Sequence, residues 1–145
     1  MRIETPEAMA LLGARIAAEL RAGDLVLLNG ELGAGKTTLT RGIGEALGVR
    51  GAVTSPTFVL ARTHPRSEPT AGDAPLVHVD AYRLGSAMEL DDLDIDFPAS
   101  IVVVEWGAGL TLDFLAIRVC VAITCSTSEV PIPCANAPNA PWVEV

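Results

Sequence analysis

The sequence predicts an α/β fold with one antiparallel hairpin, and three observations predict it. The first third of the chain alternates between helical and strand patterns around a glycine-rich turn. The middle holds two strand-like segments on either side of a polar, proline-bearing connection. Residues 101–104 form a wholly apolar, β-branched run, which is typical of a buried parallel strand. A length of 145 residues corresponds to one domain.

The first third predicts helix, strand, turn and helix, in that order. Thr5, Pro6 and an acid at residue 7 form an N-cap, a first-turn proline and a first-turn charge. Apolar residues then recur at helical spacing until Gly23, a plausible stop signal. Residues 24–29 form a short apolar run bounded by turn residues, which predicts a buried strand. A glycine-rich turn over residues 30–35 leads to a predicted helix over residues 36–47.

The rest of the chain predicts shorter elements. Residues 57–63 and 76–79 predict the two strands of the hairpin, and residues 86–96 predict a short acidic helix. The strand over residues 101–104 ends in Glu105 and Trp106, and residues 116–124 predict another strand. The last segment is rich in Ser, Pro, Ala and Asn. We therefore expect one domain over residues 1–125 and an irregular tail over residues 126–145, with a final edge strand at residues 142–145.

Charge and composition exclude several classes of function. The net charge is −8, and nine of the ten basic residues are arginines, so that Lys36 is the only lysine. Strong nucleic-acid binding and a polybasic membrane contact both need clustered positive charge, which this acidic chain lacks. We expect no signal peptide and no membrane span. Three cysteines without a fourth ligand predict free thiols in a reducing cytoplasm rather than a zinc site.

A phosphate-binding loop is the strongest motif in the chain. Residues 30–37 (GELGAGKT) fit the P-loop pattern G-x-x-x-x-G-K-[ST] between a predicted strand and a predicted helix. Glycines let backbone N–H groups converge on phosphate oxygens, and the helix directs its positive end at the same anion. The lysine adds a formal charge, and the threonine hydroxyl is a ligand for Mg²⁺. The residues of this candidate nucleotide site are Gly30, Glu31, Leu32, Gly33, Ala34, Gly35, Lys36 and Thr37.

Two other nucleotide-binding classes do not fit the same loop. A Rossmann dinucleotide loop has a third glycine where this chain has Thr38. The guanine-reading motif of common GTPases, Asn-Lys-x-Asp, needs a second lysine, and the chain has none.

Two acids at predicted strand ends are candidates for metal and water chemistry. Glu105 follows an apolar strand, as a Walker B acid does beside Mg²⁺, although it could be an ordinary polar strand end. Asp80 follows residues 76–79 and could orient water or cap a turn. Residues 55–58 lie where P-loop proteins often sense the γ-phosphate, or form a simple turn. Arg83 could contact a phosphate or belong to an interface. Trp106 could pack near the nucleotide or fill the core. The acidic run at residues 89–96 is a solvated face or a docking surface for a basic partner.

Four sequence blocks in order resemble the bacterial TsaE (YjeE) family: GELGAGKTTLTRGI, VTSPTFVL, VHVDAYRL and VVVEWG. The resemblance implies a three-layer α/β/α P-loop NTPase fold with a mixed central sheet. It also implies a Mg²⁺-dependent ATPase that is weak in isolation. Such an ATPase supports formation of threonylcarbamoyladenosine at position 37 of tRNAs, in a complex with TsaB and TsaD subunits. The match covers residues 5–107, and the last third departs from the family pattern.

The resemblance also assigns roles to residues of this chain. The nucleotide loop extends from Gly30 to Thr38, and the start of the first helix lies near the adenine, at Thr5 and Pro6. The magnesium ligands are Thr37 and Glu105, and the catalytic residues are Lys36, Asp80 and Glu105. Positions linked to switching or to partners are Thr57, Tyr82, Arg83 and Trp106. We expect the partner subunits, rather than this acidic chain, to hold the tRNA.

Two other functions remain open from the sequence. One is a small-molecule kinase, with Asp80 as base and a loop carrying Arg62 and Arg66 as a lid over the phosphates. The other is a nucleotide-gated binding module without significant hydrolysis, in which the acidic helix is the functional surface.

Overall fold

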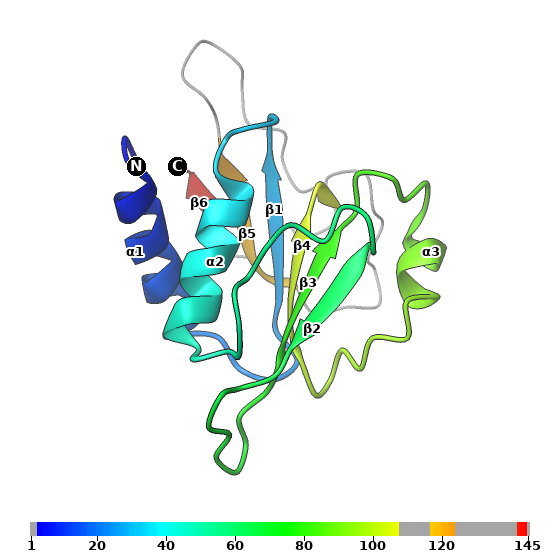
Figure 1. The fold of residues 1–145 in the computed structure, drawn as a ribbon. Coiled ribbons are helices and arrows are strands. Elements are labelled where there is room, and N and C mark those ends of the chain that lie inside the picture. The colour runs from blue at the N-terminus through cyan, green and yellow to red at the C-terminus, as the bar shows by residue number, and fades with distance from the viewer. Residues whose placement is uncertain (1–2, 108–116, 124–141, 145) are drawn as a thin grey trace.

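A computed structural model of the chain describes residues 3–107, 117–123 and 142–144. In this part of the chain six strands form one sheet, in the order β2-β3-β4-β1-β5-β6 (Figure 1). The strands are β1 (Leu25–Gly30), β2 (Ala61–His64), β3 (Leu76–Asp80), β4 (Ile101–Glu105), β5 (Ile117–Ile123) and β6 (Trp142–Glu144). Strand β2 runs antiparallel to β3, and the other neighbouring pairs are parallel. The mixed sheet with an antiparallel hairpin is therefore confirmed.

Helices cover both faces of this sheet. Helices α1 (Pro6–Ala17) and α2 (Lys36–Ala46) pack together on one face, and the short α3 (Ala87–Asp91) lies on the other (Figure 1). One apolar cluster joins α1 and α2 to β1, β3 and β4, and a second joins α3 to the opposite side of the same three strands. These clusters make the three-layer α/β/α architecture that the family resemblance implies.

Alternation along β3 and β4 determines which residues face α2. Leu76, Ile101 and Val103 belong to the apolar cluster on the α2 side, whereas Val77 and Val102 belong to the opposite cluster. Because successive side chains of a strand point to opposite faces, residues 78, 80 and 105 lie on the same side as α2. Three polar side chains are thus directed toward the helix that follows the P-loop.

Two predicted elements begin or end at other residues than expected. The strand predicted over residues 57–63 begins only at Ala61, because the Pro56 carbonyl accepts from the backbone N–H groups of Val59 and Leu60. The resulting turn places Leu60 in the left-handed region at φ 64°. The first helix ends at Ala17, well before Gly23.

The helix predicted over residues 86–96 is also shorter, since α3 covers only Ala87–Asp91. Carboxylates at residues 91, 92, 94 and 96 would lie at the negative end of a longer helix, where they are unfavourable. The chain instead turns, with Asp94 at φ 53°.

The C-terminal region is described only in part. The predicted strand over residues 116–124 is present as β5, and the expected final edge strand is present as β6 over Trp142–Glu144. The three cysteine side chains and the rest of the predicted tail lie outside what the structure describes. Among the helices of the described ranges, none has the length and apolar character needed to cross a membrane.

Candidate functional site

The P-loop connects β1 to α2, with its glycines in conformations that other residues avoid. Gly33 has a φ of 83° and Gly35, the residue before α2, has a φ of 104°. No side chain caps the N-terminus of α2, so its first backbone N–H groups are open to an anion. The N-terminus of an eleven-residue helix and a glycine turn therefore face the same place, as phosphate binding requires.

Lys36 is held within this loop rather than extended into solvent. Its side chain is 4% exposed, and Nζ donates to the carbonyl oxygens of Gly30 and Glu31, each at 2.8 Å. The ammonium also lies 3.6 Å from the centroid of the Trp106 ring, a cation–π contact. Burial lowers the pKa of Lys36 below its ordinary value, and the carboxylates of Glu105 and Asp80 act in the opposite direction.

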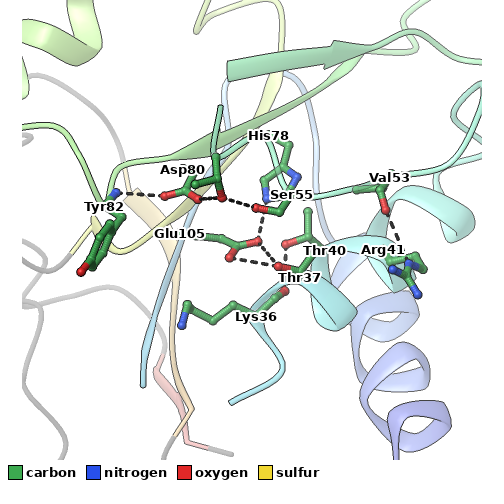
Figure 2. A network of polar contacts seen from close by, with 11 residues as sticks. Lys36, Thr37, Thr40, Arg41, Val53, Ser55, His78, Asp80, Tyr82 and Glu105 are labelled. Carbon is green, nitrogen blue, oxygen red and sulfur yellow. Dashed lines mark hydrogen bonds and ion pairs between the residues drawn. The ribbon is translucent and has the colours of Figure 1, made fainter. Parts of the chain in front are cut away.

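The two candidate acids lie side by side at the carboxyl ends of β3 and β4. Asp80 and Glu105 are register partners on these parallel strands, and both are buried. Thr37 Oγ1 contacts both oxygens of the Glu105 carboxylate, at 3.1 Å and 3.2 Å (Figure 2). The second residue of α2 is thereby brought together with an acid 68 positions later in the chain.

Glu105 has a second partner that the sequence analysis missed. His78 is fully buried, and its Nε2 lies 2.7 Å from Glu105 Oε1 (Figure 2). The sequence shows that His78 shares a face with Asp80, two residues later on the same strand, but not that Glu105 lies beside it.

Asp80 is held by a different set of residues, from the segment before β2. Thr57 Oγ1 donates to Asp80 Oδ2 at 2.5 Å, and Ser55 Oγ lies 2.6 Å from Thr57 Oγ1. Because the Thr57 proton is used on the carboxylate, the serine hydroxyl must donate to Thr57. Asp80 Oδ1 accepts from the backbone N–H of Tyr82 at 3.0 Å, and the Arg83 guanidinium donates to the Thr57 carbonyl. Residues 55–57 therefore form part of the site rather than an isolated turn.

Trp106 closes the site next to Lys36. It follows β4 directly and has a φ of 65°, a strained conformation for a residue other than glycine. The rings of Tyr82 and Trp106 meet in a T-shaped arrangement at a centroid distance of 5.2 Å, and Tyr82 is otherwise largely exposed. The strained turn thus carries an aromatic side chain over the P-loop lysine.

Comparison with known proteins identifies the family. A family model described as "Threonylcarbamoyl adenosine biosynthesis protein TsaE" matches residues 3–130. The chain belongs to the TsaE family. It is 59% identical over 130 residues to a protein from Streptomyces coelicolor, a match that covers 84% of this chain and 85% of that protein. A protein from Mycobacterium tuberculosis is 54% identical over 107 residues, which cover 68% of this chain and 62% of the relative. Both are named tRNA threonylcarbamoyladenosine biosynthesis protein TsaE.

A solved structure supports the same assignment. The crystal structure of Bacillus subtilis YdiB superimposes with a TM-score of 0.55 at 34% sequence identity, covering 74% of this chain and 63% of that chain. A solved structure that is related to this chain in sequence therefore also has a similar fold.

The residues of this TsaE family member fit a magnesium ion. Thr37 and Glu105 offer a hydroxyl and a carboxylate within 3.2 Å of one another, the hard oxygen donors that Mg²⁺ takes, one or two at a time, beside substrate phosphates. Two buried carboxylates against one buried ammonium also leave negative charge for a divalent cation to offset. No group of three or more His, Cys, Asp or Glu side chains suited to metal binding occurs in the described ranges.

The other residues predicted for the nucleotide site lie in the loop, in the first turn of α2 and at the start of α1. Glu31 and Leu32 are exposed at the tip of the loop, and Thr38 is half-buried in the first turn of α2. Thr5 is the N-cap of α1, its Oγ1 accepting from the Ala8 N–H at 3.1 Å, and Pro6 is the first helical residue. In the structure, both Thr5 and Pro6 therefore serve to begin helix α1. The start of α1 reaches the loop through Met9, whose Cε lies 3.1 Å from the position of a Cβ on Gly35.

Proposed function

We propose that this TsaE family member is a Mg²⁺-dependent ATPase that acts in threonylcarbamoyladenosine formation on tRNA, in a complex with TsaB and TsaD subunits. The observation that carries the proposal is the cluster of Lys36, Thr37 and Glu105 at the mouth of the P-loop. Membership of the family supplies the pathway, since its relatives are named for that biosynthesis.

Each element of the cluster has a task in ATP hydrolysis. The open N–H groups at the start of α2 and the Lys36 ammonium would hold the phosphates and accept the charge that develops on their oxygens. Thr37 and Glu105 would hold Mg²⁺, which neutralises phosphate charge when bound. Asp80, fixed from both sides by Thr57 and the Tyr82 N–H, would orient the attacking water.

Several exposed residues around the site suit a protein that works within a complex. Leu32, Phe58 and Tyr82 are all more than two-thirds exposed, and they border the P-loop, the Thr57 turn and Trp106. Because Thr57 bonds to Asp80 and Arg83 bonds to Thr57, contact with a partner at this turn would be transmitted to the catalytic aspartate. The net charge of −8 is consistent with partners, rather than this chain, holding the tRNA in the cytoplasm.

A reconstitution with Lys36→Ala tests the proposal. The chain and the TsaB and TsaD subunits of the same organism are incubated with unmodified tRNA, the other substrates of the modification, Mg²⁺ and ATP. Both ATP turnover and tRNA modification over many cycles are followed. We expect Lys36→Ala to lower both rates by about 10²–10³-fold, the usual cost of removing one preorganised charge.

The matched control is Arg15→Ala, which removes an exposed cation from the last turn of α1. Both rates should stay at the wild-type level in this variant. Equal modification by wild type and Lys36→Ala would show that the ATPase role is wrong. ATP consumption that increases with a small hydroxylated metabolite, and not with the partner subunits, would show instead that the chain is a kinase.

A further inference from the structure

We propose that His78 is a positioning residue that orients the Glu105 carboxylate for the metal ion, an inference that rests on the proposed function. The starting observation is its environment. His78 is 0% exposed, and apart from the hydrogen bond at Glu105 its ring makes no polar contact in the described part of the chain. A buried imidazole needs a reason for its presence, because leucine or phenylalanine would fill the same space without desolvation cost.

The hydrogen-bonding roles in this pair follow from chemistry. An ionised carboxylate can only accept, so His78 Nε2 carries the proton and donates it to Glu105 Oε1. The other ring nitrogen, Nδ1, is buried without a hydrogen-bond partner among the described residues. Only Nε2 has an acceptor within reach among the described residues, so the tautomer that carries its proton on Nε2 is the one that this environment satisfies.

The geometry shows what this donation does for the carboxylate. Oε1 takes the short bond from His78 and a longer contact from Thr37. Among the described residues, Oε2 has a hydrogen-bonding contact with Thr37 alone, at 3.2 Å. Figure 2 shows His78 and Thr37 both directed at the carboxylate. Anchoring Oε1 to a rigid ring on β3 fixes the plane of the carboxylate. Oε2 is then left facing the hydroxyl that would share the metal ion.

The backbone makes this arrangement stiff. His78 is the register partner of Val103 on the adjacent strand β4, two residues before Glu105, so the bond crosses diagonally between two hydrogen-bonded strands. Without His78, the carboxylate could rotate about its last torsion, which is a broad and shallow one. Groups that hydrogen-bond to metal ligands in this way commonly contribute about 10- to 100-fold to metal affinity.

The test compares Mg²⁺-dependent ADP binding by wild type, His78→Leu and His78→Gln, measured by isothermal titration calorimetry at pH 7.5. ADP affinity is measured in EDTA and again over a Mg²⁺ series. We expect His78→Leu to raise the Mg²⁺ concentration needed for half-maximal enhancement about 10- to 100-fold. Its ADP affinity in EDTA should stay within about twofold of wild type, since the residue touches no phosphate-binding group. His78→Gln, whose amide N–H reaches about as far as Nε2, should recover most of the loss.

His64→Leu is the matched control, because His64 is also buried on the α2 side of the hairpin but does not contact Glu105. It should leave both measurements unchanged. If His78→Leu does not fold, as judged by circular dichroism, His78→Asn replaces it, because its shorter amide cannot reach Glu105. His78→Asn should then lose the Mg²⁺ dependence that His78→Gln keeps.

Two results would overturn the positioning role and leave the proposed function intact. One is a wild-type Mg²⁺ dependence in His78→Leu or His78→Asn. The other is an equal loss of ADP affinity with and without Mg²⁺, which indicates general damage to the site. Absence of ADP and ATP binding by the wild-type protein would instead overturn the proposed function and this inference with it.

Discussion

The two faces of strands β3 and β4 differ sharply, although alternate residues of the same strands supply both. On the α3 side, Val77, Val79, Val102 and Val104 pack with Leu90 into a wholly apolar cluster. On the α2 side, the same strands end in buried polar residues, each held by a partner from elsewhere in the chain. The apolar face needs only volume and burial, whereas the polar face needs particular atoms at particular distances. We therefore expect the α3 face to determine stability and the α2 face to determine chemistry.

The largest effect is expected on the polar face, from Glu105→Gln. The substitution keeps the shape of the side chain and an oxygen that can accept from His78, but it removes the formal charge beside the metal. ATP turnover with TsaB and TsaD should fall about 10²–10³-fold. The free energy of unfolding should change little, because a neutral amide costs less to bury than a carboxylate and Asp80 remains to offset the charge of Lys36. Turnover assays and urea unfolding measure the two quantities.

The same variant separates two functions that the sequence leaves open. Unchanged support of tRNA modification by Glu105→Gln, alongside loss in Lys36→Ala, would mean that nucleotide binding suffices. The chain would then be a nucleotide-gated binding module rather than an ATPase.

A smaller effect, on stability rather than on activity, is expected from Val79→Ala on the apolar face. Val79 is fully buried and precedes Asp80 in the sequence, but its side chain faces the α3 side of the sheet. Removing two buried methyl groups should lower the free energy of unfolding by about 2 kcal/mol. ADP affinity in Mg²⁺ should remain unchanged, because no atom of the site moves out of contact. Urea unfolding and calorimetry are the measurements.

Val59→Ala serves as the control, since Val59 is 54% exposed in the turn before β2. It should change the free energy of unfolding by no more than a few tenths of a kcal/mol. A drop in ADP affinity in Val79→Ala, measured where the protein is still fully folded, would show that the two faces are coupled.

The contrast between the two faces also explains what the sequence could predict. The P-loop is contiguous, and its spacing alone places Lys36 and Thr37 at the start of a helix, as observed. The apolar runs of β1, β3 and β4 are strong patterns, and their strands were found within one residue at each end. Glu105 and Asp80 could be proposed because they end such runs.

The misplaced start of β2 and the missed His78 have one physical origin, which is that contacts between distant residues override local preference. Residues 57–60 favour a strand by composition, but Thr57 is held by Asp80 and the Pro56 carbonyl forms a turn instead. Nothing local in the sequence reveals that bond across 23 positions. His78 was missed for the same reason, because its significance depends on Glu105 in the neighbouring strand.

The smallest effect concerns the acid sensitivity of the polar side. His64 on β2 is buried on the α2 side of the sheet, and burial lowers its pKa below the ordinary value, with further lowering from His78 and Arg62. In the unfolded chain its pKa is about 6.5. The unfolded state therefore binds more protons than the folded state below about pH 6.5. The free energy of unfolding should then decrease as the pH falls from 6.5 toward the folded pKa, and level off below it.

His64→Gln isolates this contribution, because glutamine is polar, of similar size and does not titrate. The slope of stability against pH for a single proton cannot exceed about 1.4 kcal/mol per pH unit. We expect urea unfolding at pH 7.5, 6.5 and 5.5 to show a steeper fall for wild type than for His64→Gln. His78 and Arg62 are present in both proteins, so their effects cancel to first order in the comparison. Parallel curves would mean that His64 takes up its proton as readily in the folded state as in the unfolded state. Burial of His64 would then not lower the free energy of unfolding at acidic pH.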